Sequence, residues 1–100
     1  MGGGREAIPN LGGSHVAWAA LAGLCRQLAA ELGPHGVRVA WLLSPGSPDP
    51  DEPDPEADRL LLPRRPSFDQ VANAAVFAAS DWAASMTATE INLTAGAVID

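Results

Sequence analysis

The sequence contains no lysine and no tyrosine, and it has a single cysteine, Cys25. One cysteine excludes a disulfide within the chain and fits a reducing compartment. No apolar run approaches the roughly 20 residues that cross a bilayer, and no basic segment precedes an apolar one near the N-terminus. We therefore expect neither a membrane anchor nor a signal peptide, and we expect a cytoplasmic protein.

The net charge of −6 is concentrated in one stretch. Six of the twelve acidic residues fall within positions 49–58, and the other six balance the six arginines. A neutral body with one acidic segment offers no basic surface to nucleic acid or to an anionic membrane. The segment lacks the spacing of a calcium loop, and Cys25 with the two histidines lacks zinc-ligand spacing, so we expect no metal site.

The first half of the chain predicts a helix and then a strand. Residues 1–13 hold five glycines and a proline, which predicts a flexible N-terminal segment. Residues 14–32 carry an apolar stripe at helical spacing, with Ser14 as N-cap and a left-handed Gly33 at the end. Residues 37–43, VRVAWLL, are almost continuously apolar, which is typical of a parallel strand covered on both faces.

The second half repeats the pattern after a proline-rich, acidic loop at 44–58. Ser67 and Gln70 have capping-box spacing and begin a helix to residue 79, Ser80 begins a short turn, and residues 90–94 form a strand. The two strands and the helix between them predict a βαβ unit. Two parallel strands are not expected to stand alone, so the pattern indicates part of a larger α/β sheet.

Several motifs occur in the order and spacing of a known family. The segments are LAAELGPHGVRV, the Pro-Gly pair after the first strand, VANAAVFAASD and a terminal strand ending in glycine. Residues 14–100 thereby resemble the C-terminal part of the short-chain dehydrogenase/reductase family. The resemblance implies a partial Rossmann-type fold, a doubly wound parallel sheet of which this chain supplies helix, strand, helix and strand. It also implies NAD or NADP as cofactor and hydride transfer to or from a carbonyl or alcohol.

The catalytic pair of that family has no counterpart here. The family uses a Tyr-x-x-x-Lys pair near the start of the first helix, and the alignment places Ser14 and Trp18 at those positions. Shifting the alignment by one turn places Trp18 and Ala22 there, which are equally inert. With no tyrosine or lysine in the sequence, we predict no catalytic residue in this chain.

On the cofactor side, Pro45 and Gly46 match the family's loop that lines the nicotinamide. The family's glycine-rich pyrophosphate turn has no counterpart, because no strand precedes the glycines at 2–4. The usual Asn of the first strand is Ala40, and the Asp-Gly-Gly ending is Thr94, Ala95 and Gly96. We expect no tight binding of NAD or NADP to this chain alone.

The remaining candidate residues have structural interpretations. Ser14 beside His15 is better explained as a helix cap than as a nucleophile with its base, because neighbours at a helix start rarely face each other. Cys25 is expected to be a partly buried thiol, and His35 to be exposed in a turn. Trp18, Trp41 and Trp82 are expected in the core or at a subunit interface, with Trp18 as a possible plug of the cofactor cleft.

Two hypotheses about function remain open at this point. In the first, the chain belongs to a divergent NAD(P)-dependent oxidoreductase and is inactive by itself. In the second, it is a non-catalytic module that forms a homo-oligomer through helix 15–32 and the terminal strand region. Neither hypothesis includes nucleic acid or membrane as a partner.

Overall fold

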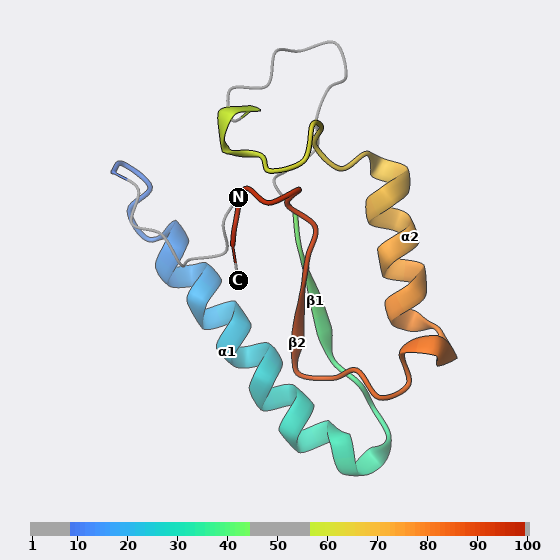
Figure 1. Cartoon of the computed structure of the whole chain (residues 1–100). Coiled ribbons are helices and arrows are strands. Elements are labelled where there is room, and N and C mark those ends of the chain that lie inside the picture. Colours follow the sequence, from blue (N-terminus) through green and yellow to red (C-terminus); the bar gives the residue numbers. More distant parts are fainter. Residues whose placement is uncertain (1–8, 45–56, 100) are drawn as a thin grey trace.

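The computed structural model describes residues 9–44 and 57–99 (Figure 1). Helix α1 (Ser14–Leu32), strand β1 (Ala40–Leu43), helix α2 (Phe68–Ala79) and strand β2 (Thr89–Asn92) follow one another. Three short 3₁₀ turns accompany them: η1 (Gly33–His35), η2 (Ala57–Arg59) and η3 (Asp81–Ala83). The predicted order of helix, strand, helix and strand is confirmed, although both strands are shorter than the predicted strands at 37–43 and 90–94.

The two strands form a parallel sheet between the two helices. Ala40 pairs with Thr89 at one end of the register, and Leu43 pairs with Asn92 at the other. Figure 1 shows α1 on one side of this sheet and α2 on the other, so the chain has three layers. Since side chains alternate along a strand, Leu42 lies toward α2, while Trp41 lies toward α1 and stacks with Arg26, 5.3 Å from the ring centroid.

Helix α1 turns a mixed face toward the sheet and leaves most of its leucines outside. From His15 onward, the side chains that are buried or half-buried recur at offsets of three and four; they are His15, Trp18, Ala22, Cys25, Ala29 and Leu32. Leu21 and Leu24, by contrast, are 54% and 53% exposed. The predicted apolar stripe is therefore divided: Ala29 and Leu32 lie on the covered face, and Leu21, Leu24 and Leu28 lie on an exposed face. Cys25 is half-buried and His35 is exposed, as predicted.

The two ends of α1 differ from the prediction. Gly13, and not Ser14, is the N-cap residue, and no side chain caps this helix; the Ser14 N–H instead donates to the Leu11 carbonyl at 3.0 Å. At the other end, Gly33 stays right-handed, and Gly36 takes the left-handed conformation with a φ of 77°. Pro34 fits the first turn of η1, where its missing N–H is not needed, so the chain continues for one more turn before it reverses.

The start of α2 follows the sequence prediction. The Ser67 hydroxyl accepts from the Gln70 N–H at 3.2 Å, and the Gln70 side chain accepts from the Ser67 N–H at 2.9 Å. This reciprocal pair satisfies two backbone donors at a helix start. The helix ends at Ala79, and Ser80 precedes η3 as predicted.

The C-terminal end of α2 is tied to the start of β1 by Arg38. Its guanidinium donates to the carbonyls of Ala78 at 2.8 Å, Ser80 at 3.2 Å and Met86 at 3.4 Å. A cation is favoured at this end of a helix because the last carbonyls carry partial negative charge. The one charged residue of the predicted strand therefore joins β1, α2 and the segment before β2.

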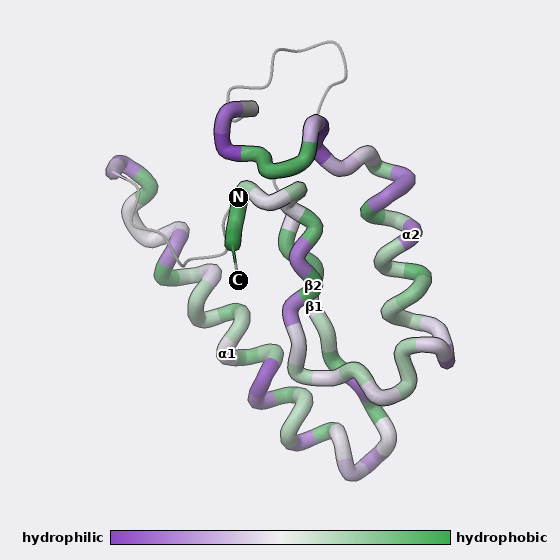
Figure 2. Tube along the Cα trace, viewed as in Figure 1, coloured by the Kyte–Doolittle hydropathy of each residue, from purple (hydrophilic) through white to green (hydrophobic). Residues whose placement is uncertain are grey.

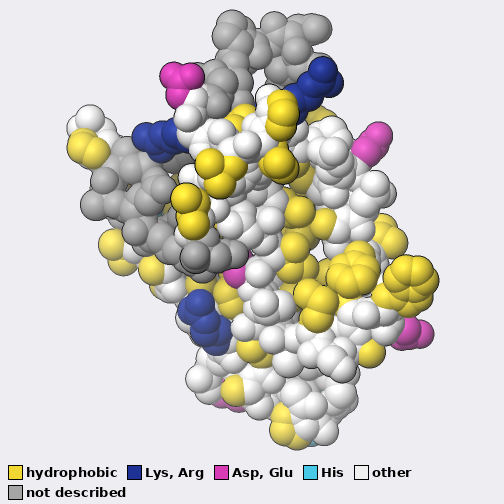
Figure 3. Space-filling view, viewed as in Figure 1, with side chains coloured by type: hydrophobic (Ala, Val, Ile, Leu, Met, Phe, Trp, Pro, Cys, Tyr) yellow, Lys and Arg dark blue, Asp and Glu magenta, His cyan; other side chains and the backbone are white. Residues whose placement is uncertain are grey.

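The core of the described fold is small. Its buried hydrophobic residues are Ala29, Leu43, Ala83 and Val98. Trp82 is 89% exposed, so its prediction as a core residue is wrong, while an interface role for it stays a prediction. Hydrophobic residues occur along both helices as well as on the strands, and they gather on the surface beside α2 and η3 (Figures 2 and 3). Within residues 9–44 and 57–99, no helix is long and apolar enough to span a membrane.

Candidate functional site

Both strands end on the same side of the sheet, where α1 and α2 begin (Figure 1). This arrangement follows from the connectivity, because a helix that joins two parallel strands runs antiparallel to them. In open α/β sheets, ligands bind outside the carboxyl ends of the strands. We therefore take this end of the sheet as the candidate site and refer to it as the carboxyl edge.

The first turn of α1 brings Ser14, His15 and Trp18 to this edge. The rings of His15 and Trp18 meet edge to face, with centroids 5.1 Å apart and planes at 60°. The His15 Nε2 atom is buried and has no hydrogen-bond partner in the described part of the chain. The Nε2 atom therefore makes no hydrogen bond to the Ser14 hydroxyl, and the interpretation of Ser14 and His15 as a non-catalytic pair stays a prediction.

The two predicted cofactor residues, Pro45 and Gly46, lie outside the described residues. Ser44, which immediately follows β1 in the sequence, is half-buried at the end of the strand. The proline-rich loop predicted at 44–58 falls largely outside the described residues as well, and its last residues, 57 and 58, belong to the short turn η2.

The end of β2 is organised by a hydrogen-bonded network that the sequence did not predict. Thr94 is 1% exposed, and its hydroxyl donates to the Asn92 Oδ1 atom at 2.7 Å and accepts from the Val98 N–H at 3.0 Å. The Asn92 amide donates to the Val98 carbonyl at 2.8 Å. These bonds fold the chain back on itself directly after the strand. The only signal for it was the spacing of Asn92 and Thr94, two residues apart at the end of the predicted strand, and polar pairs of this kind are common in loops.

The segment after η2 crosses the carboxyl edge and is anchored to this fold-back. The backbone N–H groups of Leu61 and Leu62 both donate to the Ala95 carbonyl, at 2.9 and 3.0 Å. Gly96 has a φ of 87°, and a Cβ atom there would lie 2.5 Å from the Leu61 Cβ. Glycine at this position therefore permits both the turn and the close approach of Leu61.

A hollow lies between this segment, the end of β2 and the start of α2. Apolar groups line it together with five polar residues, Arg64, Arg65, Ser67, Gln70 and Asn92. Small-molecule sites are usually concave and mostly apolar, with a few polar groups that orient the ligand. The hollow has this character, but Ser67, Gln70 and Asn92 already bond within the chain. These three side chains therefore stabilise the local structure around the hollow.

Several polar side chains at the described part of the carboxyl edge bond within the chain. A dinucleotide needs backbone N–H groups for its pyrophosphate and polar side chains for its riboses. At this edge, Ser67 and Gln70 cover the start of α2, and the side chains of Asn92 and Thr94 are bonded to each other. Residues 9–44 and 57–99 also contain no cluster of three or more metal-ligating side chains.

Comparison with known proteins places the chain in a family. A family model described as enoyl-(acyl carrier protein) reductase matches residues 1–97. The FixR protein of Bradyrhizobium diazoefficiens is 35% identical over 83 residues, which cover 78% of this chain and 30% of FixR.

Solved structures agree with this match. Carveol dehydrogenase from Mycobacterium avium, in complex with NAD, is 30% identical with a TM-score of 0.79, over 95% of this chain and 42% of that enzyme. Enoyl-[acyl-carrier-protein] reductase from Aquifex aeolicus, at 22% identity and a TM-score of 0.80, covers 95% of this chain and 40% of its own; at that identity it shows the fold alone. The chain thus spans less than half of these relatives. It belongs to the short-chain dehydrogenase/reductase family, and it has the C-terminal part of that family's Rossmann-type fold.

Proposed function

We propose that this chain is the substrate-side part of an NAD(P)-dependent oxidoreductase and that it transfers no hydride without a nucleotide-binding part. The match over residues 1–97 carries the proposal, together with the likeness to a carveol dehydrogenase whose structure holds NAD. When bound, the nicotinamide would supply or accept the hydride. The residues of this chain would shape one wall of the substrate cleft.

The hollow at the carboxyl edge supports that role. Leu62, Pro63 and Leu93 line it, and they would exclude water from an apolar substrate. Arg64 and Arg65 belong to the same lining and would add two cations just before the start of α2. The combination favours a small alcohol or carbonyl compound whose larger part is apolar.

The proposed inactivity rests on the absence of tyrosine and lysine from all 100 positions. Ser14 and Trp18 stand at the family's catalytic positions, and an indole cannot supply the positive charge of a lysine. A serine hydroxyl also lacks the acidity of a phenol, so it is a poor proton donor to a developing alkoxide without an adjacent base.

We predict that the purified 100-residue chain oxidises no NADH or NADPH. The measurement is absorbance at 340 nm with a panel of small ketones and aldehydes, together with a fluorescence titration for cofactor binding. The Mycobacterium avium carveol dehydrogenase, assayed as an oxidoreductase in the same buffer, is the positive control. Turnover that stays with the chain through two orthogonal purification steps would contradict the proposal.

A second candidate function, a non-catalytic oligomerisation module, is favoured by the outward face of α1. Leu21, Leu24 and Leu28 are exposed there, and Ile99 is 74% exposed in the terminal strand region. If this function is correct, light scattering should give a mass at least twice 10.3 kDa without any cofactor. The double change Leu21→Lys and Leu24→Lys should then restore the monomer. The matched change Val76→Lys, on the exposed face of α2, should leave the oligomer intact.

A further inference from the structure

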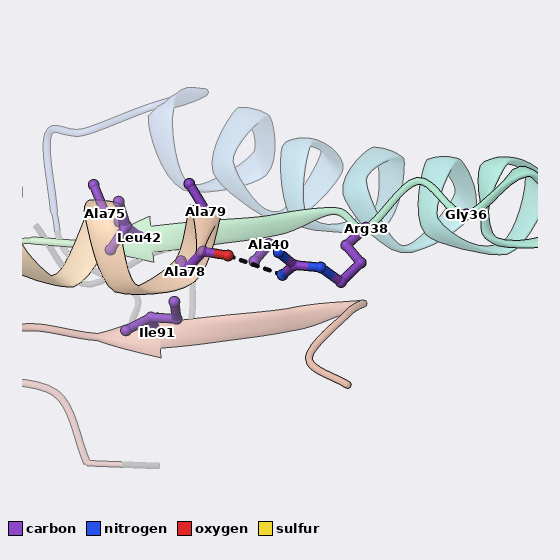
Figure 4. Close-up of a pocket in the computed structure, with 8 residues that line it drawn as sticks. All are labelled: Gly36, Arg38, Ala40, Leu42, Ala75, Ala78, Ala79 and Ile91. Atoms are coloured by element: carbon purple, nitrogen blue, oxygen red, sulfur yellow. Dashed lines mark hydrogen bonds between the residues drawn. The ribbon is translucent and has the colours of Figure 1, made fainter. Parts of the chain in front are cut away.

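Two hollows in the described part of the chain differ in how their arginines are used. The hollow between the sheet and α2 is lined by alanines of that helix, and Arg38 lies at one end of it (Figure 4). The Arg38 guanidinium bonds to the Ala78 carbonyl and to two further carbonyls, so its charge already serves the end of a helix. The hollow at the carboxyl edge instead contains the adjacent residues Arg64 and Arg65.

The segment that carries these two arginines is held at both of its ends. At one end, the N–H groups of Leu61 and Leu62 donate to the Ala95 carbonyl at 2.9 and 3.0 Å. At the other end, the capping box of Ser67 fixes the start of α2. The backbone between these anchors therefore crosses the carboxyl edge along a defined path.

Two prolines restrict the same segment further. Pro63 precedes the arginines and Pro66 follows them. A proline fixes its own φ and disfavours the helical conformation of the residue before it, which here is Leu62 or Arg65. The arginine backbone is thus confined before any ligand arrives, and this lowers the conformational entropy that binding must remove.

Arg64 is the cation of this hollow that is available to a ligand. Arg65 already interacts within the protein, whereas the exposed Arg64 guanidinium makes no hydrogen bond or ion pair among residues 9–44 and 57–99. No aspartate or glutamate of those residues lines the hollow, and Asp69, in the first turn of α2, lies outside the lining. The described lining therefore carries positive charge with no carboxylate beside it.

The rest of the lining is suited to an apolar ligand body. Leu62, Pro63, Leu93 and Ala95 are part of it, and the volume of about 1000 Å³ is sufficient for a small molecule. Apolar surroundings strengthen the attraction between charges, because they lower the local dielectric constant. A ligand with an apolar chain and one anionic end would match both parts of the lining.

We propose that this hollow takes a substrate with a carboxylate at the end of a short apolar chain, and that Arg64 binds the carboxylate. The inference rests on the proposed function and names the substrate class of its cleft. A guanidinium offers two parallel N–H groups, which match the two oxygens of one carboxylate. A phosphate dianion would call for further donors, and Ser67 and Gln70 are already bonded to each other.

The test is an NMR titration of the 100-residue chain at pH 7 without cofactor. The probes are 5-oxohexanoate and its neutral carboxamide, which have the same chain length and the same ketone. We expect the acid to bind at least about threefold more tightly than the amide, as for a partly shielded ion pair. The backbone amide signals of residues 61–67 and 93–96 should shift during the titration. Hexyl phosphate, as a third probe, should bind no more tightly than the acid.

Three variants locate the charge that is responsible. Arg64→Gln should make the affinities for acid and amide equal, and Arg64→Lys should keep part of the preference, because it keeps the charge without the planar fork. Arg26→Gln makes the same change at an exposed arginine of α1 outside the hollow, and it should retain the full preference. Circular dichroism checks that all three variants are folded.

Four results would overturn the inference. They are equal binding of acid and amide, a preference that survives Arg64→Gln, tighter binding of hexyl phosphate, and a preference that appears only after the acids at 49–58 are changed to amides. In the last case the chain's own carboxylates would occupy Arg64. A charge preference found together with NADH turnover would support the inference and contradict the proposed function, whereas equal binding without turnover would overturn the inference alone.

Discussion

Replacing Arg38 with alanine is expected to lower the free energy of unfolding by about 2–3 kcal/mol. Each hydrogen bond to a charged group contributes about 1.5–3 kcal/mol when it is shielded from solvent, and less when it is exposed. The side chain is half-buried and serves the carbonyls of Ala78, Ser80 and Met86. Its loss leaves the C-terminal end of α2 without its cation and frees it from β1. Urea unfolding followed by circular dichroism measures the change, which corresponds to a midpoint shift of about 1 M.

Two further variants separate this role from a general effect of charge. Arg38→Lys keeps the charge but not the planar fork, so it should recover only part of the loss. Arg26→Ala removes an exposed guanidinium that stacks on Trp41, and it should cost no more than about 1 kcal/mol. Equal losses for Arg26→Ala and Arg38→Ala would show that Arg38 does not join the elements as described.

Replacing Gly96 with alanine is expected to lower the free energy of unfolding by about 2–4 kcal/mol, from backbone strain and overlap together. The positive φ of 87° disfavours any side chain, and the added Cβ would meet both Cβ and Cγ of Leu61 at 2.5 Å. Leu61 cannot move away freely, because its N–H and that of Leu62 are bonded to the Ala95 carbonyl. The same urea titration measures the loss.

Two control variants divide the effect of Gly96→Ala into its causes. Gly12→Ala has a φ of 53° with nothing within 4 Å of the new Cβ, so it should cost only about 1 kcal/mol of backbone strain. Ala95→Gly should instead stabilise the chain by up to about 1 kcal/mol, because Ala95 already has a φ of 54°. A loss for Gly96→Ala no larger than that for Gly12→Ala would mean that Leu61 moves aside.

The sequence predicted the elements of this fold because their signals are local. The capping box at Ser67 and Gln70, the helical spacing through Leu32 and the apolar run before Ser44 each act through neighbours in the chain. Such signals determine where a helix begins or where a strand lies. They also carried the family resemblance, since the motifs are these same helix and strand segments.

The sequence did not predict the details that depend on contacts between segments. The left-handed residue is Gly36 and not Gly33, because Pro34 fits a further turn and the reversal must deliver the chain to β1. The candidate site shows the same limit. The absence of tyrosine and lysine can be read directly from the sequence, whereas the bonding of Asn92 to Thr94 and Val98 requires the fold-back after β2.

By itself, the sequence determined the order of helices and strands, the family and the absence of the catalytic pair, because all three depend on residue identity and spacing along the chain. The tertiary structure alone decided which face of each element is covered. Leu24 and Ala29 are both apolar and lie on one helix, yet Leu24 is exposed and Ala29 buried, because only Ala29 lies on the face of α1 that packs on the sheet. Within residues 9–44 and 57–99, it also decided that β1 and β2 pair with each other in parallel, with Leu42 beside Ile91.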